Sequence, residues 1–205
     1  MFQTVWVLTN IASGAYTYIH NKLVQNNNNN NIYIILGSTT AVQALLEHEI
    51  VRPVFKILQY EGKYETLNTS RQQLVDQCVW LLANIAGDSI TARDLMLEMS
   101  LDTHLTRLVE SLEGSANASE SDIAKKLAFC FVNCVRLKPK PSMEVRERVV
   151  QGVLSLIDIS GAAPSDTNEM LTNCLWCINH ASSDGLESIL YFFTEIAIPP
   201  RSVTP

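Results

Sequence analysis

Apolar and polar positions follow their most regular pattern between residues 74 and 88. At about 100° per residue the apolar side chains fall on one broad arc, which predicts a helix packed against others. This arc holds Leu74, Cys78, Leu82, Ile85 and Ala86. A separate narrow stripe, with one residue per turn, holds Gln77, Trp80, Asn84 and Asp88. We therefore expect one face in the core, a row of functional groups on the other, and Gly87 ending the helix in a left-handed C′ conformation.

The stripe recurs along the chain, which is typical of a repeat protein. Residues 1–14 contain a close copy, and two weaker copies follow the central one. The close copy holds Gln3, Trp6, Asn10 and Gly14, and the weaker copies hold Lys126, Phe129, Asn133 and Leu137, then Asn173, Trp176, His180 and Asp184. The last two intervals between the aromatic anchors are close to a helical repeat of roughly 40 to 47 residues. The first interval is longer, and we ascribe the excess to the Asn-rich segment 15–37 and to a polar loop at 61–70.

Amphipathic segments fill the chain between the aromatic anchors. Residues 41–58 are typical of a short helix, a break near Pro53 and a second helix, and residues 96–112 and 143–157 repeat this arrangement. None of these segments alternates with the period of a strand. The chain is therefore predicted to be all-α, with three helices per repeat, stacked so that each unit contacts mainly its neighbours.

Composition narrows the range of functions. The 15 basic and 21 acidic residues give a net charge of −6, which argues against a nucleic-acid or anionic-membrane surface and allows a basic partner. The apolar runs are shorter than the roughly 18 to 20 residues that a membrane helix needs. The sequence shows no phosphate loop, nucleophile elbow or metalloprotease motif, so we expect no enzyme, no catalytic residue and no cofactor.

The 5 cysteines all occupy apolar helical positions. An odd number of buried thiols suits a reducing compartment such as the cytosol or the nucleus. The pair Cys130 and Cys134, with the pair Cys174 and Cys177, could also indicate a zinc site. Consecutive core positions on apolar helices explain the same spacing, and we expect no metal.

Two of the copies carry a family resemblance. The motif Trp-x-Leu-Thr-Asn-Ile-Ala-Ser-Gly at 6–14 and the motif Gln-Cys-Val-Trp-x-Leu-x-Asn-Ile-Ala-Gly-Asp at 77–88 resemble consecutive armadillo repeats of importin-α, the adapter that binds nuclear localisation signals. The weaker copies fit the next two repeats, so the resemblance covers the chain except for 15–37 and about the last dozen residues. It implies an all-α, armadillo-repeat right-handed superhelical solenoid of about three to four repeats, truncated at both ends.

The resemblance also divides the chain into units. Residues 1–14 would be the last helix of a truncated repeat, and residues 15–37 a disordered Asn-rich insertion. Armadillo repeats would follow at 38–88, with an inserted loop at 61–70, at 89–138 and at 139–185, and residues 186–205 would start a truncated repeat or form a tail.

By the same resemblance, the stripe binds a Lys/Arg-rich nuclear localisation signal. Its peptide-binding residues would be Trp6, Asn10, Gly14, Gln77, Trp80, Asn84, Asp88, Phe129, Asn133 and Trp176. Stacked tryptophans can hold a Lys or Arg stem between their rings, and the asparagines can bind the main chain of the peptide. In the family, the counterpart of Asp88 binds the most discriminating lysine, helped by a threonine hydroxyl where this chain has Val42. The chain also departs from the family in having Phe129 in place of a tryptophan.

The expected function is that of an adapter for importin-β-dependent nuclear import, with cargo proteins that carry basic localisation signals. Such a protein would occupy both the cytoplasm and the nucleus. Importin-β itself is expected as a partner only if the full-length protein carries the basic N-terminal segment with which the family recruits it. We expect no nucleic-acid or membrane partner. The alternative is a generic armadillo scaffold with no import role, and Trp6, Trp80 and Asp88 together favour the adapter.

Overall fold

The computed structural model of the protein describes residues 4, 5, 8, 38–47, 49, 51–60, 62–114, 122–159 and 169–196. All regular structure in these residues is helical. The α-helices are α3 (Ser38–Glu47), α4 (Val51–Leu58), α5 (Thr69–Asp88), α6 (Ile90–Glu98), α7 (Leu101–Ser111), α8 (Asp122–Val135), α9 (Met143–Ile159), α10 (Glu169–Ser182) and α11 (Leu186–Tyr191). A 3₁₀ turn at Tyr64–Thr66 precedes α5, and a π-helical turn at Phe192–Ile196 follows α11. The all-α prediction is confirmed.

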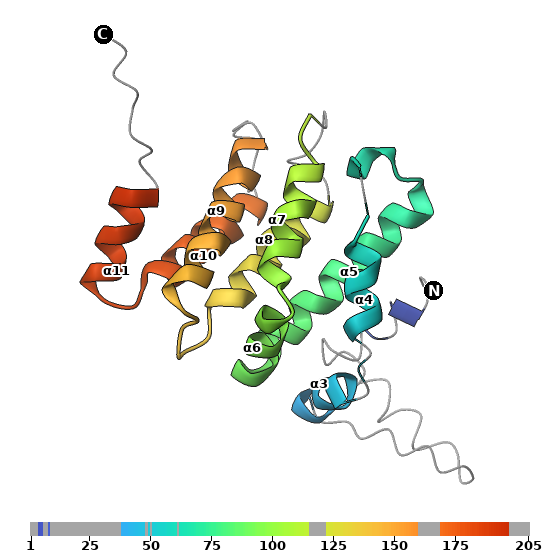
Figure 1. Ribbon diagram of the computed structural model, residues 1–205, viewed down its shortest axis with the longest axis horizontal. Coiled ribbons are helices and arrows are strands. Elements are labelled where there is room, and N and C mark those ends of the chain that lie inside the picture. The colour runs from blue at the N-terminus through green and yellow to red at the C-terminus, as the bar shows by residue number, and fades with distance from the viewer. Residues whose placement is uncertain are drawn as a thin grey trace.

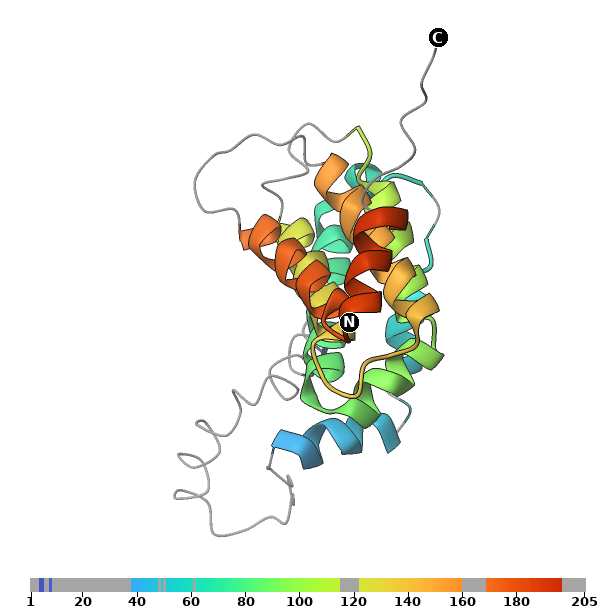
Figure 2. The ribbon, with the colours of Figure 1, turned by 90° about the vertical axis from the view of Figure 1, so that its left-hand side faces the viewer.

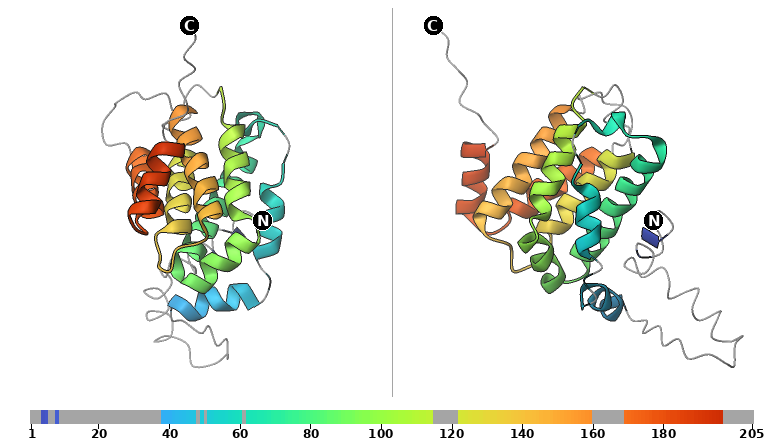
Figure 3. Two further views of the ribbon diagram at one scale, coloured as in Figure 1. Left: turned by 60° about the vertical axis from the view of Figure 1, so that its left-hand side comes forward. Right: turned by 45° about the vertical axis from the view of Figure 1, so that its right-hand side comes forward.

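The helices form two layers (Figure 1). Figure 2 looks along the stack and shows α5, α8 and α10 in one layer and α4, α7 and α9 in the other. α8 packs between α5 and α10, and α7 packs between α4 and α9. The two views in Figure 3 show α3 and α6 lying across one end of these layers. Each group of helices therefore contacts mainly its neighbours along the stack, as a solenoid requires.

One apolar core runs between the layers. The predicted arc of α5 belongs to it, because Cys78, Leu82 and Ile85 are completely buried. The fully buried ring of Phe131 on α8 packs directly on Gly152 of α9. A Cβ atom at residue 152 would lie 2.8 Å from Cζ of this ring, so glycine is what allows α8 and α9 to approach so closely.

The breaks between helices differ in part from the prediction. The first break lies between α3 and α4, where Glu49 has a φ of 51°, a few residues before Pro53. Pro53 instead occupies the first turn of α4, where its missing N–H has no helical partner to lose. The predicted break between α6 and α7 is present at Ser100, with a φ of 62°. α9 is one continuous helix without the predicted break, and the residue limits of the repeats stay a prediction.

Two buried arginines hold the ends of the helices in the α5–α8–α10 layer. Arg93 of α6 donates to the carbonyl oxygens of Leu137 at 3.0 Å and Pro139 at 2.8 Å, just after α8. Arg146 of α9 donates to the carbonyl oxygen of Ala181 at 2.8 Å, in the last turn of α10. Cations stabilise the carbonyl groups that a helix leaves unpaired at its C-terminus. Arg146 therefore stabilises the C-terminal end of α10, and Arg93 holds the turn that follows α8.

Candidate functional site

The predicted stripe of α5 lies on the less buried side of the helix. Trp80 is 38% exposed, and Gln77, Asn84 and Asp88 are half-buried. α5 begins after Asn68, whose side chain accepts a hydrogen bond from the backbone N–H of Arg71, and it continues without interruption to Asp88. The structure therefore separates the apolar arc from the stripe as the periodicity predicts.

Asp88 lines a pocket of about 560 Å³ that α3, α5 and α6 form at the C-terminal end of α5. The described residues lining it are Val42, Gln43, Leu46, Glu47, Asp88, Ser89, Thr91, Ala92 and Leu95. This lining contains two carboxylates, Asp88 and Glu47, and no Lys, Arg or His. Burial raises the pKa of Asp88, and its hydrogen bond with Ser89 opposes that rise. Two acids against an apolar wall can bind the ammonium group and the stem of a lysine. We call this the acidic pocket.

Val42 lies in the wall of the acidic pocket and is 1% exposed. The position where the family has a threonine therefore contributes methyl groups and no hydroxyl. Gln43 donates to Glu47 at 3.0 Å on the same helix, which holds one of the two carboxylates in place. The polar side chains left in the lining are those of Gln43, Glu47, Asp88, Ser89 and Thr91.

Gly87 does not end α5 in a left-handed conformation, as the sequence predicted. It lies inside the helix, which ends one residue later at Asp88 with Ser89 in an extended conformation. Its role is close packing, because a Cβ atom there would lie 2.9 Å from Nδ2 of Asn133 and 3.1 Å from Nη2 of Arg136. Arg136 donates to the carbonyl oxygen of Gly87. A glycine at this position therefore lets side chains of α8 reach the backbone of α5.

Asn133 of α8 contacts the α5 backbone beside Gly87 and is buried. It is 1% exposed, and its Nδ2 donates to the carbonyl oxygen of Ala83 at 2.9 Å. Its Oδ1 is buried and has no hydrogen-bond partner in the described part of the chain. The amide of Asn84 is different, since the residue is half-buried and its Nδ2 finds no partner among the described residues. The sequence assigned both asparagines to the peptide, and the structure uses Asn133 for a contact between α8 and α5.

The rings of Trp80 and Phe129 stack on each other. Their centroids are 5.9 Å apart and their planes meet at 29°. Holding an aliphatic stem between two rings needs a separation of roughly 7 to 8 Å, twice the usual contact distance between carbon atoms. The predicted slot between these rings is therefore closed, and a Lys or Arg stem can enter it only if Phe129 turns aside.

A second pocket of about 560 Å³ lies between α8 and α10 on the same layer. Its described lining consists of Phe129, Val132, Asn133, Arg136, Asn173, Trp176 and His180. Trp176 is 53% exposed and stacks on His180, with ring centroids 5.6 Å apart. Sequence reasoning missed Arg136, although the alignment of the copies puts it at the position of Gly87 in the central copy. We call this the cationic pocket, because it contains Arg136 and no carboxylate among these residues.

Part of the predicted site cannot be placed. Trp6, Asn10 and Gly14 lie outside the described residues. The structure thus brings together Gln77, Trp80, Asn84 and Asp88 on one side of α5, with Phe129 and Trp176 on the neighbouring helices of the same layer.

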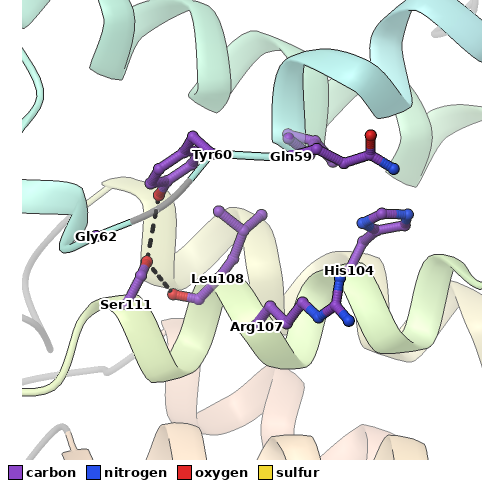
Figure 4. A pocket seen from close by; sticks show the side chains of 8 residues that line it. Gln59, Tyr60, Gly62, His104, Arg107, Leu108 and Ser111 are labelled. Atoms are coloured by element: carbon purple, nitrogen blue, oxygen red, sulfur yellow. Dashed lines mark hydrogen bonds between the residues drawn. The ribbon is translucent and has the colours of Figure 1, made fainter.

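A further pocket of about 320 Å³ lies in the other layer, between the end of α4 and α7 (Figure 4). Figure 4 shows the Tyr60 hydroxyl directed at Ser111, 3.2 Å away, with His104 and Arg107 farther along α7. No residue of the predicted stripe lines it. It is therefore separate from the candidate peptide site.

The cysteines are buried free thiols, as the sequence predicts. Burial raises the pKa of Cys78 and of Cys174 to about 12. Such thiols stay protonated at neutral pH and are poor nucleophiles and poor metal ligands. The described part of the chain contains no group of His, Cys, Asp and Glu side chains arranged to hold a metal ion. It also contains no helix that is both long and apolar enough to cross a membrane.

These observations define a class of protein: an all-α solenoid that presents a line of aromatic, amide and carboxylate side chains along one layer of helices. Comparison with known proteins specifies the type. The chain is 26% identical over 202 residues to importin subunit alpha-1b of Oryza sativa subsp. japonica and to importin subunit alpha-2 of Arabidopsis thaliana. It is 24% identical over 209 residues to the probable importin subunit alpha-A of Dictyostelium discoideum. No family model matches the chain.

These alignments cover 98% of this chain and 29% to 32% of the three relatives. The chain therefore spans about three tenths of the length of the curated relatives it matches. Together with the helical stack, they support an importin-α-like armadillo solenoid, which is the resemblance drawn from the sequence motifs.

Proposed function

We propose that the chain binds an extended, Lys/Arg-rich peptide along the α5–α8–α10 layer, as the signal-recognising part of a nuclear import adapter. The observation that carries this proposal is the acidic pocket. It has the volume for a lysine side chain and two carboxylates, and its described lining has no cation of its own. Asp88 is half-buried and Glu47 is exposed, and a bound ammonium group would form charge-assisted hydrogen bonds with both carboxylates.

Trp80 and Asn84 extend the site along α5. The exposed face of Trp80 can cover the stem of a neighbouring basic residue. The unpaired Nδ2 of Asn84 can donate to a peptide carbonyl after a small side-chain rotation. A main-chain contact of this kind holds a peptide in register without reading its side chains, which is what recognition of many different cargo proteins requires.

The import role rests on the relatives, which are importin α subunits by name. In this role the protein would move between cytoplasm and nucleus with its cargo, and it would bind importin-β only if the full-length protein carries a basic N-terminal segment. No step of this role needs catalysis or a cofactor. The alternative of a generic scaffold draws support from the closed Trp80–Phe129 stack and from the buried Asn133, because both remove predicted contacts with a basic peptide.

Peptide binding to the purified chain distinguishes the two functions. A labelled peptide with a Lys-Lys/Arg-x-Lys/Arg core is titrated beside a control peptide whose lysines are replaced by alanine, with fluorescence anisotropy as the readout. The adapter predicts that only the basic peptide binds, and that Asp88→Asn weakens it roughly ten- to hundredfold through loss of a charge-assisted hydrogen bond. Glu110→Gln, an exposed acid on α7 in the other layer, is the matched control. Equal binding of both peptides would leave only the scaffold.

A further inference from the structure

The two pockets of the α5–α8–α10 layer have opposite charge. The acidic pocket is lined by Asp88 and Glu47, with no basic side chain among its described residues. The cationic pocket is lined by Arg136 and His180, with no acidic side chain among its described residues. A single peptide that runs across the layer would pass from one to the other.

Arg136 is available to a ligand at the cationic pocket. Its side chain is exposed, and among the described residues it forms no ion pair. Its one hydrogen bond there goes from Nη2 to the carbonyl oxygen of Gly87. A guanidinium has five N–H donors in a planar fork, so several remain for a carboxylate.

The surroundings of Arg136 add positive charge and hold it in place. Lys140 donates to the carbonyl oxygens of Val135 at 2.7 Å and Arg136 at 3.3 Å. Burial lowers the pKa of His180, and the charges of Lys140 and Arg136 lower it further. Asp184, just after α10, is paired with Arg146 at 3.4 Å. The described lining of the pocket therefore offers a guanidinium and no carboxylate to a ligand.

We infer that the ligand of this layer has two ends of opposite charge: a Lys or Arg for the acidic pocket, and an Asp or Glu whose carboxylate binds Arg136 in the cationic pocket. This inference rests on the proposed peptide-binding function and adds the sequence class of the peptide. Trp176 supplies the apolar wall for the stem of the acidic residue, while Asn173 offers an additional hydrogen-bonding group.

The spacing of the two charges follows from the helices between the pockets. The guanidinium of Arg136 donates to the carbonyl oxygen of Gly87, the residue before Asp88, so the two charged groups are separated by about one interaxial distance of 8 to 10 Å. An extended chain rises about 3.3 Å per residue. The acidic residue should therefore lie roughly two or three positions from the anchoring lysine.

Matched peptides test this inference. Each carries the same basic core and one variable residue, Asp, Ala or Lys, placed outside the core about two or three positions from the anchoring lysine. We expect one of these placements to give the affinity order Asp, then Ala, then Lys, with steps of about three- to tenfold. Arg136→Gln should abolish the order, and Arg136→Glu should reverse it. Arg107→Gln, which removes an exposed arginine from the other layer, should leave it unchanged.

The readout separates charge recognition from misfolding and from failure of the proposed function. A damaged fold would weaken all three peptides alike, whereas the reversal by Arg136→Glu requires direct recognition. If the three peptides bind equally while binding still depends on Asp88, the inference is wrong and the proposed function stands. If no placement binds in an Asp88-dependent manner, both are wrong.

Discussion

α5 and α8 are equivalent helices with the same asparagine at the same position of the stripe, and they use it differently. Asn84 on α5 is half-buried, and its Nδ2 is buried without a hydrogen-bond partner among the described residues. Asn133 on α8 is buried and donates to the carbonyl oxygen of Ala83 on α5. Gly87 leaves room for this contact, because a Cβ atom there would lie 2.9 Å from Nδ2 of Asn133. The comparison teaches that one position of the repeat pattern can serve the contact between repeats instead of a ligand.

The largest effect on this comparison should come from filling the space beside Gly87 with a side chain. Gly87→Val would place side-chain atoms within 3 Å of the Asn133 amide, since the first Cβ alone lies 2.9 Å from Nδ2. We expect the free energy of unfolding to fall by about 1 to 3 kcal/mol, as for other overpacked sites. Urea denaturation followed by circular dichroism measures it. Unchanged stability would contradict the assigned role of Gly87.

A pair of alanine substitutions should separate the two asparagines. Asn133→Ala removes a hydrogen bond between helices and should lower the free energy of unfolding by about 1 kcal/mol while leaving peptide affinity within about twofold. Asn84→Ala should do the reverse, with affinity roughly three- to tenfold weaker and stability nearly unchanged. Denaturant unfolding and peptide anisotropy on both variants provide the four values. Equal behaviour of the two variants would remove the distinction between them.

The smallest effect should come from the aromatic residues of the same two helices. Phe129→Trp restores the stronger cation–π face and should tighten binding of a basic peptide by about 0.5 to 1 kcal/mol. The gain requires the stack with Trp80 to open, because the rings are only 5.9 Å apart. Isothermal titration calorimetry can detect a change of this size. A loss of affinity would show that the stack stays closed in the complex.

Periodicity predicted much of this molecule. The arc and the stripe of α5 follow from the spacing of Leu74, Cys78 and Trp80, and the structure places them accordingly. The same rule failed for Asn133, because a helical register gives the direction of a side chain and not the size of the residue it meets on the next helix. Arg136 escaped notice for a related reason: its importance comes from its contact with Gly87, 49 positions earlier in the chain. Features that depend on packing between repeats could not be predicted from one repeat.

The central claim, that Asp88 recognises a basic residue of a peptide, is tested most directly by exchanging the charges. Asp88→Lys should weaken the basic peptide by on the order of a hundredfold or more, because like charges meet in the acidic pocket. A peptide whose anchoring lysine is changed to glutamate should bind this variant better than it binds the unaltered chain. Glu110→Lys, with the same change of net charge on exposed α7, controls for long-range electrostatics. Indifference of the basic peptide to Asp88→Lys would contradict the account.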